Sequence, residues 1–173
     1  MAGKEEKTNV MRLLEQKKIP YTLHVFPDGD IGADGLTIAL ALGVDPERSF
    51  KTLVTRGASG GYYVFDLPVN RTLDLKKAAR AVGEKSVAMV LSRELLPLTG
   101  YVHGGCSPLG MKKPFPTVFH QTAVCHPNIC VSAGKIGRQI EVAPEVLLTL
   151  TGAKTADLVT EEKESSSSSL SEP

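Results

Sequence analysis

Short apolar segments, separated by turns that contain glycine or proline, recur along this chain and set its fold class. Alternation or β-rich composition predicts strands over residues 21–26, 49–55, 62–67, 86–90, 117–120, 129–132 and 139–142. Helical spacing and capping residues predict helices over residues 8–18, 36–42, 73–83, 92–96 and 143–150, with Pro97 ending the fourth. Strands and helices do not alternate evenly, which argues against a doubly wound parallel sheet. The sequence therefore predicts an α+β fold.

The length of 173 residues favours one domain. We place the folded domain at residues 8–160, after a flexible N-terminus of residues 1–7. Residues 161–173 are rich in Ser and Glu and have almost nothing to bury, so we expect a disordered tail. No apolar signal segment is visible at the N-terminus, and no apolar run reaches the ~18 residues that span a bilayer. These features predict a cytoplasmic protein without a membrane partner.

The charge balance limits the classes of partner. The net charge is +1, the isoelectric point is near 7.7, and the chain has no Trp and only 5% aromatic residues. A protein that coats nucleic acid would be more basic or offer more stacking surface, so we expect no DNA partner. A protein that grips only the end of an RNA stays compatible with this composition. The odd count of three cysteines argues against a disulfide framework.

The stretch from Thr99 to Gly110 has the highest density of turn-forming residues in the chain, with four glycines and Pro108 within twelve residues. Glycine lets the chain turn through positive φ and lets another group come close to the backbone. Successive N–H groups in such a loop can hold an anion or a carbonyl oxygen that gains negative charge. The alternative is an ordinary tight surface turn, because glycine clusters are a general loop signal.

Lys51 stands inside an apolar strand segment, next to Phe50 and Leu53. Its ammonium group therefore either reaches solvent or lines a pocket, and the residues alone favour solvent. The basic face of the helix at 73–83, formed by Lys76, Lys77 and Arg80, is likewise either a solvated face or a surface for phosphates.

Some potential metal ligands are interpreted otherwise. Asp28, Asp30 and Asp34 resemble part of a calcium loop, but the downstream Glu that would complete it is missing. The segment from Cys125 to Cys130, with His120 nearby, has no C-x₂-C pair and contains a proline, so we expect no zinc there. The lone strand histidine, His24, is interpreted as structural.

Four motifs occur in order and carry a family resemblance: 49–53 (SFKTL), 73–79 (LDLKKAA), 99–113 (TGYVHGGCSPLGMKK) and 132–137 (SAGKIG). Together they resemble the YbaK/EbsC family of free-standing aminoacyl-tRNA deacylases, which are related to the editing domain of bacterial prolyl-tRNA synthetases. The resemblance covers residues 8–159. It implies a compact, mixed, largely antiparallel and curved sheet that is flanked by helices.

The resemblance also implies a site and a reaction without a metal or organic cofactor. Lys51 would project into the substrate pocket and be needed for activity, and the backbone around Gly104 and Gly105 would polarise the ester carbonyl. In the cysteine-specific members the substrate's own thiol attacks its ester. Further substrate contacts are expected from Phe26, Tyr101, Ser107, Pro108, Ser132, Gly134 and Gln139. Ser107 precedes a proline, so it is also expected to fix the loop.

The residues leave several functions open. Phe26 stands where cysteine-specific members tend to have Tyr, and Gln139 stands where some have Asp. The main hypothesis is hydrolysis of Cys-tRNA(Pro) through its 3′ end, with prolyl-tRNA synthetase as a possible partner. The alternatives are an Ala-tRNA(Pro) deacylase that uses water, a module that binds an aminoacyl or nucleotide ligand or a synthetase, and a hydrolase that uses the Cys106 thiol.

Overall fold

The computed structural model describes residues 7–26 and 34–163. Its helices are α1 (Asn9–Gln16), α2 (Gly35–Ala41), α3 (Leu75–Val82), α4 (Ser92–Thr99) and α5 (Pro144–Thr151), with 3₁₀ turns η1 (Pro46–Arg48) and η2 (Gln121–Cys125). Its strands are β1 (Thr22–Val25), β2 (Phe50–Gly57), β3 (Tyr62–Pro68), β4 (Arg71–Leu73), β5 (Val87–Met89), β6 (Thr117–His120), β7 (Ile129–Lys135), β8 (Arg138–Val142), β9 (Lys154–Ala156) and β10 (Val159–Lys163).

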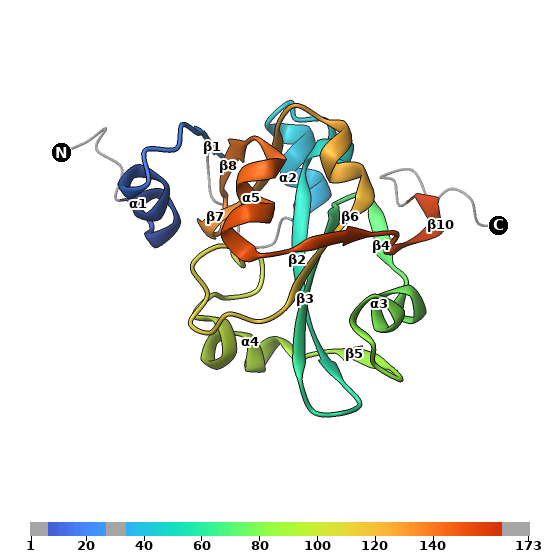
Figure 1. The fold of residues 1–173 in the computed structure, drawn as a ribbon. Helices are drawn as coiled ribbons and strands as arrows, with labels where there is room; N and C mark the ends of the chain where they lie inside the picture. The colour runs from blue at the N-terminus through green and yellow to red at the C-terminus, as the bar shows by residue number, and fades with distance from the viewer. Residues whose placement is uncertain (1–6, 27–33, 164–173) are drawn as a thin grey trace.

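The strands form a five-stranded sheet in the order β5-β2-β3-β6-β9, a three-stranded sheet in the order β1-β8-β7, and the pair β10-β4. Only the β3–β6 and β6–β9 pairs within these sheets are parallel. The predicted α+β class with a mixed, largely antiparallel sheet is confirmed. The β2–β3 hairpin runs through the centre of the molecule, with α1 and α4 on one side and α3 and β10 on the other (Figure 1).

Strand β2 connects the two larger apolar clusters. Phe50 and Val54 point into the cluster that includes the buried residues of α1 and α5. Leu53 lies on the opposite face of the strand and packs against the cluster around Phe65 and α3. Successive strand residues point to opposite faces, so one strand serves both cores.

The helix starts follow their capping side chains. Thr8 caps α1, Asp34 caps α2 and Asp74 caps α3, each by accepting hydrogen bonds from backbone N–H groups of the first turn. Gly100 ends α4 in the left-handed conformation that glycine adopts without a steric cost. The predicted starts of these helices are confirmed to within two residues.

One helix end and three strands differ from the sequence-based expectation. Helix α4 continues through Pro97 to Thr99, because Pro97 removes only one helical hydrogen bond and the Gly100 N–H donates to the Leu96 carbonyl at 2.8 Å. Strands β4, β9 and β10 are new. The first two have only three residues each, too few for a detectable alternation. Strand β10 pairs with β4, so the first residues of the predicted tail lie in a strand.

Within residues 7–26 and 34–163, no helix has the length and apolar character needed to cross a bilayer. Of the acidic residues considered for calcium, Asp28 and Asp30 lie outside the described residues. Asp34 instead caps α2 through a 2.8 Å hydrogen bond from the Thr37 N–H.

Candidate functional site

The strand pairings place the predicted pocket residues side by side. Ser49, just before β2, forms a parallel bridge with Cys130 of β7, so the start of β2 lies alongside β7. Two residues further along these strands stand Lys51 and Ser132. Ser132 pairs with Gln139 of β8, and Gln139 pairs with His24 of β1. We call Lys51, Ser132, Gln139 and His24 the polar row.

Lys51 lies at the end of the polar row that faces the start of α2. Its side chain is half-buried, between the strand and that helix start. The pKa of Asp34 is lowered chiefly by its hydrogen bond from the Thr37 backbone N–H, and the positive charge of Lys51 lowers it further. The positive charge of Lys51 therefore acts at the start of α2.

The centre of the polar row offers oxygen atoms. Ser132 Oγ accepts a 3.0 Å hydrogen bond from the Gly134 N–H, which fixes the hydroxyl beside the bend that Gly134 makes at φ +98°. Gln139 is only 9% exposed, and its buried Oε1 accepts no hydrogen bond from the described residues. A buried amide oxygen without a donor is costly, so it favours a bound water or ligand. Phe26 continues from β1 and donates its N–H to the Gly137 carbonyl at 2.6 Å.

The glycine loop reaches the polar row through the turn between β7 and β8. A Cβ at Gly105 would lie 3.0 Å from the Ile136 nitrogen, so loop and turn are in close backbone contact. Gly104 is exposed, with φ +90°. The Gly105 N–H donates to the Val102 carbonyl at 2.9 Å and closes a tight turn. The Gly105 N–H is therefore engaged within the loop itself. The Gly104 N–H bonds none of the described residues.

Three of the expected contact residues act inside the loop. The Tyr101 hydroxyl accepts from Asn9 Nδ2 and donates to the Leu109 carbonyl, and the side chain is buried. Ser107 Oγ accepts from the Leu109 N–H at 3.2 Å, as expected for a residue that fixes the loop. Pro108 is buried between them. These contacts hold the loop against α1, and the polar atoms of Tyr101 and Ser107 already have protein partners.

Replacing Gly105 with alanine is expected to lower the free energy of unfolding by about 1–3 kcal/mol, the usual cost of forcing atoms into a packed site. The new Cβ would press on the backbone of Lys135 and Ile136, which cannot rotate away. Gly61→Ala is the matched control, because its Cβ would meet only the tip of the Tyr63 side chain at 3.3 Å. Chemical denaturation measures both. Equal stability of the two variants would show that the loop does not depend on this contact.

Sequence reasoning missed a buried carboxyl group beneath the loop. Asp66 of β3 is fully buried, and its Oδ1 accepts a hydrogen bond from the Thr52 hydroxyl. Burial raises the pKa of Asp66 to about 8, although the hydrogen bond from Thr52 lowers it. Burial, and then the nearby Asp66, raise the pKa of the Cys106 thiol to about 12. The signal was an Asp inside the apolar strand segment at residues 62–67.

His24, at the far end of the polar row, belongs to an ion-paired cluster. Its Nε2 lies 2.8 Å from Glu141 Oε1, and Arg48 donates to Glu141 Oε2 at 3.2 Å. The pKa of Glu141 is lowered first by His24 and then by Arg48. The Cys130 sulfur completes a group whose ligand atoms lie within 4.8 Å of one another. Burial raises the pKa of the Cys130 thiol to about 12. The cluster fits the structural role expected for His24.

A groove of about 290 Å³ lies on the other side of Glu141. It is lined mainly by the chain before β1 and the start of α5, namely Ile19, Pro20, Tyr21, Thr22, Asn128, Glu141, Val142, Ala143 and Val146. None of the predicted site residues lines it. We therefore place the candidate site at the polar row and the glycine loop, which the turn between β7 and β8 connects.

Comparison with known proteins gives this arrangement a family. Residues 36–150 match the family model of the aminoacyl-tRNA editing domain. EbsC of Enterococcus faecalis (strain ATCC 700802 / V583), named as a candidate Cys-tRNA(Pro)/Cys-tRNA(Cys) deacylase, is 46% identical over 158 residues, which cover 91% of this chain and 96% of EbsC.

Solved structures agree with this assignment. A candidate trans-editing enzyme for prolyl-tRNA synthetase superposes with a TM-score of 0.76 at 28% identity, over 90% of this chain and 99% of its own. The hypothetical protein APE2540 has the same fold, with a TM-score of 0.76 at 22% identity over 88% of this chain and all of its own. The resemblance in the four motifs is confirmed, and the chain belongs to the aminoacyl-tRNA editing domain family.

Proposed function

We propose that this protein hydrolyses the ester bond of mischarged aminoacyl-tRNA and that its substrate is Cys-tRNA(Pro). The observation that carries the proposal is an adjacency of strands in a chain of the editing family. Strand β2, which carries Lys51, bridges to β7 at Ser49, and Ser132 of β7 pairs with Gln139. The turn that follows β7 lies against the glycine loop at Gly105. EbsC carries the same substrate in its name. The name of the solved trans-editing relative contains prolyl-tRNA synthetase, and we propose this synthetase as the partner whose mischarged product this protein hydrolyses.

In the proposed reaction the thiol of the bound cysteine is the nucleophile. Its sulfur forms a bond to the ester carbonyl carbon, the bond from that carbon to the 3′-terminal ribose oxygen breaks, and the thiol proton passes to this oxygen. Water then opens the cyclic thioester and releases cysteine. Neither step needs an atom of the protein to form a covalent bond, so the residues of the chain position and polarise the substrate.

Two groups of the site are suited to these tasks. The Gly104 N–H is a donor for the carbonyl oxygen, and one such donor in a preorganised site is worth ~2.7–4 kcal/mol in the transition state. The Lys51 ammonium would hold the terminal adenosine end, and close positioning of this kind can lower a barrier by ~7–11 kcal/mol in favourable cases. Gln139 Oε1 is an acceptor within the same row.

Ala-tRNA(Pro) is the second candidate substrate, with water as the nucleophile. Phe26 and Gln139 leave the amino-acid specificity open, because cysteine-specific members tend to have Tyr at the first position and some have Asp at the second. The test is the release of labelled amino acid from Cys-tRNA(Pro) and Ala-tRNA(Pro) by the purified protein. Hydrolysis of Cys-tRNA(Pro) supports the proposal. Hydrolysis of Ala-tRNA(Pro) alone would make Ala-tRNA(Pro) the substrate in place of Cys-tRNA(Pro). A protein that clears neither is a binding module.

The variant Cys106→Ser is expected to keep the kcat/KM of the natural protein. The Cys106 thiol is buried and its pKa is raised to about 12, so at neutral pH it is not the thiolate that attacks an ester. Single-turnover deacylation measures the effect, with Cys106→Ala as a second variant. If both variants lose activity while they unfold at the temperature of the natural protein, the thiol is the nucleophile and the substrate-assisted mechanism fails.

A further inference from the structure

Charge is distributed unevenly along this nearly neutral chain. Residues 85–138 contain six Lys and Arg and one acidic residue, Glu94, which gives this segment a formal charge of +5. The whole chain carries +1, so the remaining residues together carry −4. The positive segment includes the glycine loop and both of its neighbours, helix α4 and the turn between β7 and β8. The modest net charge therefore conceals a strongly basic part next to the candidate site.

Three exposed cations from different elements flank the glycine loop. Arg93 is on α4, which ends where the loop begins, and Lys113 follows the end of the loop. Lys135 is on the other side, in the turn whose backbone lies against Gly105. Lys112 sits between them, with its aliphatic stem 3.4 Å from a Cβ built on Gly100 and its Nζ 3.4 Å from the Pro97 carbonyl. We call Arg93, Lys112, Lys113 and Lys135 the basic rim.

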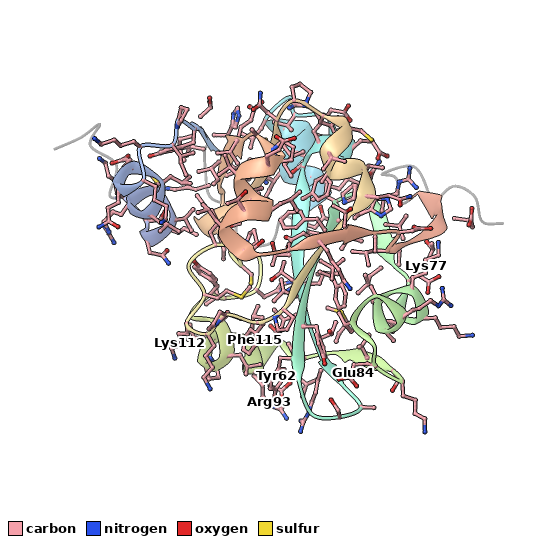
Figure 2. All side chains as sticks on the ribbon, viewed as in Figure 1. Tyr62, Lys77, Glu84, Arg93, Lys112 and Phe115 are labelled. Atoms are coloured by element: carbon pink, nitrogen blue, oxygen red, sulfur yellow. The ribbon has the colours of Figure 1, made fainter. Side chains whose placement is uncertain are left out.

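Figure 2 shows Arg93, Lys112, Tyr62 and Phe115 on the side of the molecule where α4 lies, and Lys77 on the opposite side. The Tyr62 and Phe115 rings are tilted against each other with centroids 5.6 Å apart. The exposed guanidinium of Arg56 lies 5.8 Å from the centroid of the Tyr62 ring. The ring pair thus holds a fifth cation in place on this side, at a low cost in side-chain entropy.

The opposite basic surface is less suited to an anionic polymer. On α3, Lys77 donates to the Asp157 carboxylate at 2.9 Å and to the Val159 carbonyl at 2.7 Å, so its charge is engaged within the protein. Lys76 and Arg80 are exposed there, on a helix that carries none of the candidate site residues. The α3 face was the phosphate surface considered from the sequence, whereas the basic rim lies next to the glycine loop of the candidate site.

We propose that the basic rim binds the phosphates of the tRNA strand that leads to the 3′ end held at Gly104. This rests on the proposed function, since it names the surface by which that substrate is held. Exposed Lys and Arg that neutralise phosphates give a binding constant that falls with salt, because each contact releases counterions. Within residues 85–138 the single carboxylate is that of Glu94, so this segment contributes few groups that repel a phosphate chain.

The test compares two triple variants of equal charge. The rim variant is Arg93→Ala, Lys113→Ala, Lys135→Ala, and the control variant is Arg80→Ala, Lys76→Ala, Lys154→Ala. Each set removes one Arg and two Lys, all exposed. Binding of uncharged tRNA(Pro) is titrated over a series of salt concentrations. The rim variant is expected to bind about 10- to 100-fold more weakly at low salt, with a log–log salt slope that is shallower by about 2–3. The control variant should bind as the natural protein does.

Several outcomes overturn the proposal. They are equal binding by the rim and control variants, an equal loss in both, or binding to prolyl-tRNA synthetase that depends on the rim while tRNA binding does not. Hydrolysis of aminoacyl-adenosine is measured in parallel and should be the same in all three proteins, because this short substrate lacks the phosphates. If the natural protein hydrolyses no ester, and the rim variant still binds tRNA more weakly than the natural protein, the proposed function fails and the RNA-binding surface stands.

Discussion

Lys51→Ala is expected to lower kcat/KM for Cys-tRNA(Pro) by a factor of about 100 to 1,000, on the scale of losing one group that acts on the transition state. Lys51 follows Ser49, which bridges to β7, and its positive charge acts on the Asp34 carboxylate at the start of α2. Alanine removes both the charge and the donors that would orient the terminal adenosine. Chemistry that relies on a thiol within the substrate is sensitive to such orientation, because the protein adds no nucleophile.

Rapid-quench deacylation with saturating enzyme separates the chemical step from binding. Lys76→Ala removes an exposed lysine of α3 and is the matched control, which should act as the natural protein does. Lys51→Arg keeps the charge but alters its geometry, so we expect a smaller loss, mainly in kcat. Thermal unfolding of all three variants checks their fold. A Lys51→Ala protein with full activity would remove Lys51 from the site and with it the proposed mechanism.

Asp66→Asn is expected to remove a pH dependence of stability that the natural protein shows between about pH 4 and pH 8. The pKa of Asp66 is raised from 3.8 to about 8 in the folded state, mainly by burial. In this range the unfolded chain has lost the proton and the folded chain keeps it, so stability falls as pH rises, by about 1.4 kcal/mol per pH unit. Below pH 4 both states are protonated, and above pH 8 both are ionised, so the slope ends at each limit.

At pH 7 the ionisation of Asp66 in the unfolded state opposes folding by about 4 kcal/mol, as an upper bound. Asparagine removes this cost but buries an amide NH₂, which costs about 1–3 kcal/mol if it finds no acceptor. The slope is therefore the decisive readout, measured by urea denaturation from pH 4 to pH 9. Thr52→Val is the companion variant. It removes the hydrogen bond that lowers the pKa of Asp66, so the slope should extend to higher pH. An unchanged slope in Asp66→Asn would place its source elsewhere.

Local patterns were sufficient for most of the fold. The β2–β3 hairpin was predictable because two apolar segments flank the glycines at residues 57–61. The helix caps at Thr8 and Asp74 were predictable because Thr and Asp are typical N-cap residues. The β4–β10 pair was not predictable, since it joins segments some ninety residues apart and neither segment has a strand pattern of its own. Pairing of this kind depends on what the rest of the fold brings together.

The site divides in the same way. Residue pattern alone left Lys51 in solvent, and only the family resemblance placed it in a pocket, because alternation assigns a strand face but not what covers it. The glycine loop was evident from composition. Which N–H groups of the loop already have partners was not evident, since the turn that engages the Gly105 N–H is visible only in the structure. Asp66 was hidden because a single carboxyl in an apolar strand resembles an edge position until its depth is known.

Strand β2 is part of both large apolar clusters and also bridges to the three-stranded sheet at Ser49. Neither half of the molecule can therefore melt while the other stays folded, because each would lose one wall of its interior. Lys51 sits on this shared strand. The chain therefore keeps the candidate site only as long as the whole fold persists. Damage in the cluster around α3 lowers the fraction of folded molecules and leaves the site unchanged in those that remain folded.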